Sequence, residues 1–162
     1  MLDNIPYFPY ILSAFIGIGL AAASGFRVFL PMFAVSLASY MGWIPMNDHF
    51  MWLAGLPTLI TTGIATIVEV LAYYIPYVDH LLDTISVPLA TVAGSVLFAS
   101  QFADLGTFPT WALALIAGGG TAAAISSGFA GTRAASTATT GGLGNSVVAT
   151  TETASISFSL CF

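Results

Sequence analysis

Long, nearly uninterrupted apolar segments dominate the chain. They cover residues 10–24, 57–76, 86–103 and 109–129. A transmembrane β-strand would alternate apolar and polar positions over roughly ten residues, and none of these segments does so. Segments of this kind are typical of membrane-spanning helices, in which the backbone polar groups are satisfied within the helix. The pattern therefore predicts an all-α fold, a polytopic transmembrane helical bundle.

The first apolar segment is too long for one straight span. A helix over residues 10–41 would be ~48 Å long, whereas the hydrocarbon core of a bilayer is ~30 Å thick. A glycine stands beside a charge at Gly25-Phe26-Arg27, and Pro31 removes a backbone donor one turn later. We expect a first helix to end near Ser24 and a shorter helix or re-entrant piece to follow from 28 to 41.

The rest of the chain alternates between apolar segments and polar or small-residue connectors. Residues 117–151 consist mostly of Gly, Ala, Ser and Thr, which allow close helix packing in lipid. Their glycine-rich part, 136–145, is a poor helix former and predicts an irregular loop. Together the segments predict about five spans with broken helices in one transmembrane domain, residues 1–162. The other expected elements are an interfacial loop at 42–50, a helix at 57–75, a polar connector at 77–84, a span after Pro88 that ends near Asp104, a span from 109, and a last apolar piece at 146–162.

Composition supports a membrane location. Of 162 residues, 57% are apolar and 6% are charged, whereas about a quarter of an ordinary soluble domain is charged. So few charges could not cover a water-facing surface, and the lipid bilayer is the expected partner. The net charge of −5 argues against nucleic acid as a partner, because a negative protein is repelled by phosphates. With two arginines and no lysine, the positive-inside rule gives no orientation.

The two halves of the chain share an order of motifs. Ser-Gly-Phe at 24–26 is followed by Arg27, the same tripeptide at 127–129 is followed by Arg133, and each copy leads on to a glutamate. Two-span units separated by one extra span would insert in opposite orientations, which is the inverted-repeat plan of many transporters. Chance matching of small-residue strings is the alternative explanation. The units would be residues 10–76 and 109–162, with the middle span at 86–104.

Four charged residues interrupt or flank segments that should lie in hydrocarbon: Arg27, Glu69, Arg133 and Glu152. One unpaired charge at the bilayer centre costs ~2.5–3.5 kcal/mol on insertion scales. Two arginines and two glutamates form a neutral set, so we predict that they pair across helices and line a path for a substrate or ion. Alternatively, the pairs only hold the bundle together or reach the membrane interface.

The predicted loop beside Arg133 contains further candidates for this path. Thr139, Thr140 and Asn145 would offer hydroxyl, amide and free backbone groups to an ion or polar solute. A water-exposed connector between helices is the alternative.

A candidate metal site lies in the polar connector. On a helix, Asp79, His80 and Asp83 would lie close together, and they could bind a divalent cation or relay protons. Because these three side chains lack a fourth ligand, a solvated turn at the membrane surface is the favoured explanation.

Four stretches of the sequence resemble one family. Residues 19–31 (GLAAASGFRVFLP), 69–76 (EVLAYYIP), 79–84 (DHLLDT) and 135–145 (ASTATTGGLGN) are similar to the bacterial membrane family known as domain of unknown function 4126 (DUF4126). The likeness covers nearly the whole chain, and the last motif is specific. The family pattern has Pro where this chain has Ser146, and a longer apolar C-terminus. The resemblance implies a bacterial cytoplasmic membrane and no established activity.

The expected function is that of a small inverted-repeat transporter or channel for an ion or small polar solute. The alternative is a non-catalytic subunit of a larger respiratory or photosynthetic membrane complex, which the short chain and the 13% aromatic content favour. The expected partner besides lipid is a homo-oligomer or a larger membrane complex, and a homo-oligomer would argue against the subunit. The sequence contains no Walker loop, Cys/His metal cluster or haem signature. No cofactor is therefore predicted, and an enzyme is not expected.

Overall fold

The described part of the chain contains helices and no β-strand, which confirms the all-α fold class. The computed structural model describes residues 7–72, 74–102, 106–141, 144, 147, 150, 151 and 154, and it leaves the side chains of residues 76, 77, 79, 80 and 83 undescribed. The elements are α1 (Phe8–Phe26), α2 (Phe29–Tyr40), the 3₁₀ helix η2 (Asp48–Ala54), α3 (Leu56–Ala72), α4 (Pro76–Ala99), α5 (Thr107–Leu113), the π-helical segment η3 (Ala114–Gly119) and α6 (Gly120–Thr140).

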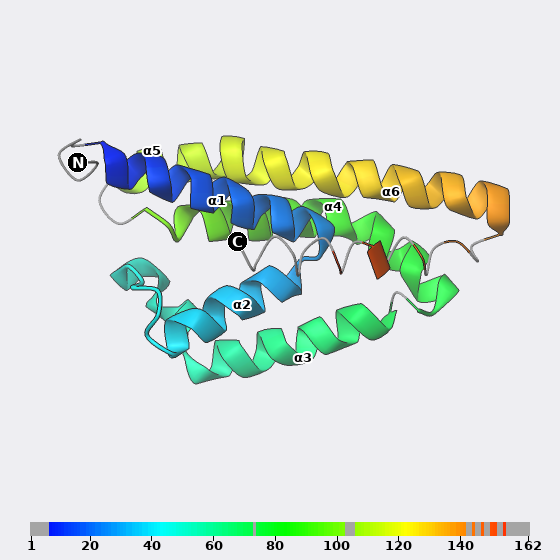
Figure 1. Cartoon of the computed structure of the whole chain (residues 1–162), viewed down its shortest axis with the longest axis horizontal. Coiled ribbons are helices and arrows are strands. Elements are labelled where there is room, and N and C mark those ends of the chain that lie inside the picture. Colours follow the sequence, from blue (N-terminus) through cyan, green and yellow to red (C-terminus); the bar gives the residue numbers. More distant parts are fainter. Residues whose placement is uncertain are drawn as a thin grey trace.

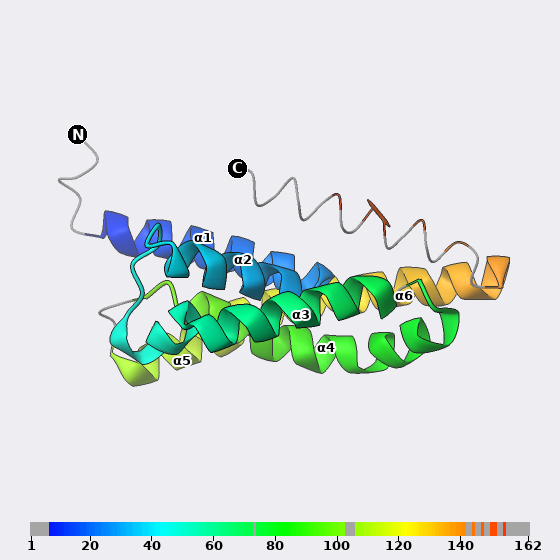
Figure 2. The same cartoon turned by 90° about the horizontal axis from the view of Figure 1, so that it is seen from below.

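The helices form two packed groups. In the first, α1, α4 and the continuous α5-η3-α6 helix run side by side along the long axis (Figure 1). In the second, α2 and α3 form an antiparallel hairpin joined by η2, and this hairpin lies along one side of the first group (Figures 1 and 2). The Ser36 hydroxyl donates a 2.6 Å hydrogen bond to the Leu53 carbonyl, which fixes η2 against α2.

Small residues let α4 and the η3-α6 helix approach closely. A Cβ on Gly94 would lie 2.6 Å from the Cβ of Ala122, and one on Gly118 would lie 2.6 Å from the Cβ of Phe98. Both distances are shorter than real carbon contacts allow, so only glycine fits at these positions. Close approach of helix backbones at small residues is the packing expected in lipid, where burial of apolar surface gives little driving force.

Two helices are long and apolar enough to cross a membrane: α1, and the continuous 34-residue helix Thr107–Thr140. The pair η2 and α3 is bent by 56° and would be a third span if it is counted as one. By contrast, α2 and the part of α4 from Thr84 to Ala99 are apolar but shorter. The prediction of five spans is therefore not confirmed, and neither is the inverted repeat. The break after Phe26 leaves α2 with 12 residues, and the first turns of α4 are polar.

Three predicted connectors contain helix. Residues 77–84 belong to α4, because the helix begins at Pro76, which is well suited to a first helical turn, and it continues through Pro88. η2 begins at Asp48, so the last residues of the interfacial loop predicted at 42–50 are helical.

The irregular loop predicted at 136–145 was also partly wrong, because α6 continues to Thr140. The hydroxyls in this segment bond to carbonyl oxygens one turn earlier, as in the 2.7 Å bond from Thr140 to Ser136. Such bonds keep polar side chains satisfied within a helix. The helix ends at Gly141, whose φ of 64° is left-handed and favours glycine.

Candidate functional site

The chain breaks between α1 and α2 at Arg27, as the sequence predicted. Arg27 has an extended backbone (φ −145°, ψ 127°), while its N–H still donates to the Ala23 carbonyl at 3.2 Å. Gly25 lets the end of α1 touch α6, because a Cβ there would lie 2.8 Å from the Ala122 carbonyl oxygen. The break therefore lies inside the protein, and only 1% of the Arg27 surface is exposed.

Glu69 reaches this break from α3. Its Oε1 accepts a hydrogen bond from the Val28 N–H at 2.8 Å, and its Oε2 accepts one from the Phe29 N–H at 3.1 Å. These N–H groups stand at the start of α2, where a helix has no partners of its own for them. A carboxylate is also favoured there by the helix dipole. Glu69 is 6% exposed, so this cap is buried.

A second arginine approaches the same carboxylate from α6. Arg133 is 3% exposed. Arg27 and Arg133 both interact electrostatically with Glu69. The structure thus brings together three of the four charged residues that the sequence singled out, from the α1-α2 break, α3 and α6. We call Arg27, Glu69 and Arg133 the charged cluster. The fourth, Glu152, lies outside the described residues.

Hydroxyl groups from α4 and α6 adjoin the charged cluster. The Ser126 hydroxyl lies 3.4 Å from the Ser86 hydroxyl, at hydrogen-bonding distance. Both serines and Arg133 line a narrow cavity of about 10 Å³ beside the end of α1. The rings of Phe26 and Phe129 lie against it, with centroids 4.7 Å apart. This space holds a single water at most.

A larger cavity, the α2–α4 cavity, opens beside Glu69. It lies between α2, α3 and α4 and has a volume of about 250 Å³. Its wall is apolar except for Glu69 and Ser86, and Ser86 lines both cavities. The full lining is Val28, Phe29, Ala65, Val68, Glu69, Ala72, Val78, Leu82, Ile85, Ser86 and Leu89.

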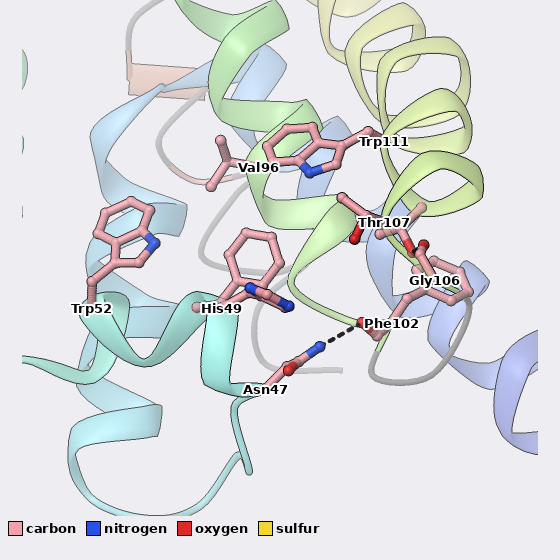
Figure 3. A pocket seen from close by; sticks show the side chains of 10 residues that line it. Asn47, His49, Trp52, Val96, Phe102, Gly106, Thr107 and Trp111 are labelled. Atoms are coloured by element: carbon pink, nitrogen blue, oxygen red, sulfur yellow. Dashed lines mark hydrogen bonds between the residues drawn. The ribbon is translucent and has the colours of Figure 1, made fainter.

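An aromatic pocket of about 320 Å³ lies where η2 meets the end of α4 and the start of α5 (Figure 3). Trp52 and His49 line it from η2, and Trp111 lines it from α5. The Asn47 amide donates a 3.5 Å hydrogen bond to the Phe102 carbonyl at its edge (Figure 3). Sequence reasoning missed this pocket, because it treated His49 as part of the interfacial loop at 42–50.

The other predicted site residues do not join the charged cluster within the described structure. Thr139 and Thr140 are exposed near the end of α6, and their hydroxyls bond to carbonyls of their own helix. Asn145 lies outside the described residues. Asp79, His80 and Asp83 belong to the first turns of α4, but their side chains are not described. Among the residues that were described, no three His, Cys, Asp or Glu side chains are grouped as metal ligands would be.

Residues 14–162 match a family described as a domain of unknown function (DUF4126). The chain belongs to the DUF4126 family. This confirms the resemblance inferred from its motifs, and the match includes the whole charged cluster. No curated protein and no solved structure matches the chain. The DUF4126 description names no activity, so the function has to be inferred from the charged cluster and its cavities.

Proposed function

We propose that this DUF4126 protein is an integral membrane transporter or channel for an ion or small polar solute, residing in the cytoplasmic membrane of a bacterium. The charged cluster would be its solute site. The observation that carries the proposal is the convergence of Arg27, Glu69 and Arg133, all nearly fully buried, inside a bundle with two helices long enough to span a bilayer.

Energetics favour a role beyond packing. Each charge placed at the bilayer centre costs ~2.5–3.5 kcal/mol on insertion scales. Replacing a buried ion pair by well-packed apolar side chains is often neutral or stabilising. A bundle that needed only stability would therefore gain little from two arginines and a glutamate in its interior. Ionisable residues inside membrane proteins more often mark substrate and ion pathways.

The division into two groups of helices supports movement at the site. The α2-η2-α3 hairpin packs closely within itself but touches α4 only sparsely, and the α2–α4 cavity lies in this interface. The chain changes direction at Arg27, where α1 of one group meets α2 of the other. Rocking of one group against another around a central site is a common transport mechanism.

Flux through proteoliposomes tests the proposal. Arg27→Gln and Arg133→Gln should each abolish uptake of the solute, while Thr139→Val, on the exposed end of α6, should leave it unchanged. All variants should first be matched for their elution from a sizing column. Unchanged uptake in both folded arginine variants would contradict the proposal.

A second candidate function is that of a non-catalytic subunit of a larger respiratory or photosynthetic membrane complex. The aromatic pocket favours it, because Trp52 and Trp111 remain about half exposed there and aromatic side chains are enriched at protein interfaces. Extraction in a gentle detergent followed by native electrophoresis separates the two functions. A monomer or homo-oligomer supports the transporter, whereas comigration with a large complex supports the subunit.

A further inference from the structure

The three tryptophans of the chain gather at one end of the helix bundle. Trp43 follows α2, Trp52 belongs to η2 and Trp111 belongs to α5. The two helices long enough to cross a membrane, α1 and Thr107–Thr140, both begin at this end (Figure 1). Tryptophan is enriched where a membrane meets water. The aromatic pocket at this end therefore lies at the depth of lipid headgroups, where charged ligands can reach it.

Aromatic rings form both the floor and the rim of this pocket. Phe50 and Phe102 are buried and belong to one packed core. Trp52 and Trp111 are about half exposed, and they reach the pocket from η2 and α5 (Figure 3). The Phe50 and Trp111 rings are tilted by 41°, with centroids 6.3 Å apart, so they are not stacked face to face. Aromatic rings from several elements thus share one space of about 320 Å³.

The charges around the aromatic pocket favour a cation as its ligand. Among the described residues that line it there is no lysine or arginine. The only two arginines of the chain, Arg27 and Arg133, are buried in the charged cluster, and there is no lysine. Asp48 is exposed at the start of η2, directly before His49. In a chain with a net charge of −5, an anion would find no counter-charge here, whereas a cation would be attracted.

Aromatic faces suit one kind of cation in particular. The face of a ring is negative, so it attracts a cation that lies within about 6 Å of its centroid. A quaternary ammonium group fits such a site because its methyl groups pack on rings and it has no hydrogen to donate. We propose that the aromatic pocket binds a quaternary ammonium group, such as that of choline, against Trp52 and Trp111. This site goes beyond the proposed transport function and does not depend on it, because it shares no residue with the charged cluster.

The volume of the pocket admits a ligand of this size. Choline has seven non-hydrogen atoms, which at ~30 Å³ each need about 210 Å³. The pocket, of about 320 Å³, holds choline together with a few waters. Two sources share this chemistry at headgroup depth: a free choline-like solute and the headgroup of phosphatidylcholine.

Binding of choline to the purified full chain in dodecyl maltoside tests the proposal, by calorimetry and by tryptophan fluorescence. The comparison ligand is 3,3-dimethyl-1-butanol, which has the shape of choline but no charge. Choline should bind saturably and about tenfold or more tightly than the neutral alcohol. Equal binding of the two would overturn the cation assignment, and a lack of saturable choline binding would overturn the site.

Substitution of the tryptophans locates the bound group. Trp52→Leu and Trp111→Leu should each weaken choline binding about tenfold or more, and Trp111→Phe should weaken it less, because phenylalanine keeps an aromatic face. Trp43→Leu is the matched control, since Trp43 is largely exposed at the same end and does not line the pocket. An equal loss of binding in Trp43→Leu and Trp111→Leu would overturn the pocket as the site.

A variant that adds a charge keeps the test decisive if the tryptophan variants fail to fold. Thr107 is exposed and lines the pocket, whereas the neighbouring Phe108 is largely exposed and does not line it. Thr107→Arg should abolish choline binding by repulsion, and Phe108→Arg should leave it nearly unchanged. Choline binding that survives Thr107→Arg would overturn the site.

Nanodiscs of two compositions identify the source of the group. If the ligand is a free solute, choline should bind equally in phosphatidylcholine and phosphatidylglycerol nanodiscs. If the ligand is a headgroup, choline should bind in phosphatidylglycerol nanodiscs and fail to bind where phosphatidylcholine already fills the pocket. Either result supports the quaternary ammonium site. Loss of choline binding in both kinds of nanodisc would overturn it.

Discussion

The hydrogen bond from the Val28 N–H to Glu69 can be removed without changing the backbone. Val28 has a φ of −72°, which lies in the range that proline imposes. Arg27 before it is extended, as a residue before proline prefers. Val28→Pro therefore suits the backbone at the start of α2, but it replaces the donor that lies 2.8 Å from Oε1 of Glu69 with a ring carbon.

The expected cost follows from the charge on the acceptor. A hydrogen bond to a charged group contributes about 1.5–3 kcal/mol to stability. Proline at a compatible position returns about 0.4–1 kcal/mol by restricting the unfolded chain. Val28→Pro should thus lower the free energy of unfolding by more than about 1–2 kcal/mol while Glu69 is present, because the proline ring also displaces the Glu69 carboxylate. In a Glu69→Ala background the acceptor is already missing, and the same substitution should raise stability by about 0.4–1 kcal/mol.

A double-mutant cycle measures this coupling directly. Wild type, Val28→Pro, Glu69→Ala and the double variant would be unfolded reversibly in mixed detergent micelles, followed by circular dichroism. Thr66→Ala, one turn earlier on α3, serves as a control for loss of a polar side chain from that helix. The expected coupling energy is at least about 1.5–3 kcal/mol. An equal loss of stability from Val28→Pro with and without Glu69 would refute the cap.

Other predictions concern packing and helix ends. Gly94→Ala should destabilise the bundle by about 1–3 kcal/mol, because the added Cβ would lie 2.6 Å from that of Ala122. Gly120→Ala, which meets nothing within 4 Å, should be neutral or stabilising by about 0.5–1 kcal/mol; equal melting temperatures for the two variants would contradict this packing. Ser36→Ala should cost about 1–3 kcal/mol, because the Leu53 carbonyl loses its 2.6 Å hydrogen bond. Amide exchange in η2 should become faster, and an unchanged exchange rate would contradict the role of this bond. Gly141→Ala should cost about 1–2 kcal/mol, because its φ of 64° strains an L-residue. Amide exchange in the last turn of α6 should then become faster, and an unchanged exchange rate would contradict this prediction.

The sequence predicted the structure best where a residue pattern was incompatible with all but one local structure. A 32-residue apolar segment with a glycine and an arginine in its middle had to break, and the break is at Arg27. The convergence of Arg27, Glu69 and Arg133 followed from the cost of an isolated charge in lipid. Both inferences depend on strong energetic penalties, which leave few alternatives.

The sequence was least informative where weak preferences compete. Residues 77–84 are polar enough for a connector, but a helix that begins at Pro76 includes them. Thr139 and Thr140 have low helix propensity, yet their hydroxyls bond to the preceding turn and let α6 continue.

The backbone partners of Glu69 could not have been predicted from sequence either. Its carboxylate suggested an arginine partner, whereas the structure gives it the N–H groups of Val28 and Phe29 as well. Those bonds depend on how the hairpin folds back onto the break. The α2–α4 cavity is likewise a product of three helices meeting imperfectly, which no local pattern encodes.

Measuring whether water reaches the charged cluster decides most directly whether the cluster is a solute site or only a contact that holds the helices together. Ser86 lines both cavities beside the cluster, and Ile64 is exposed on the outer side of α3. In a Cys161→Ser background, the Ser86→Cys and Ile64→Cys variants would be reacted with a charged, water-soluble thiol reagent in proteoliposomes. A solute site predicts that Ser86→Cys reacts faster, and that Arg27→Gln changes its rate. Reaction of Ser86→Cys no faster than that of Ile64→Cys would contradict a solute path through the cluster.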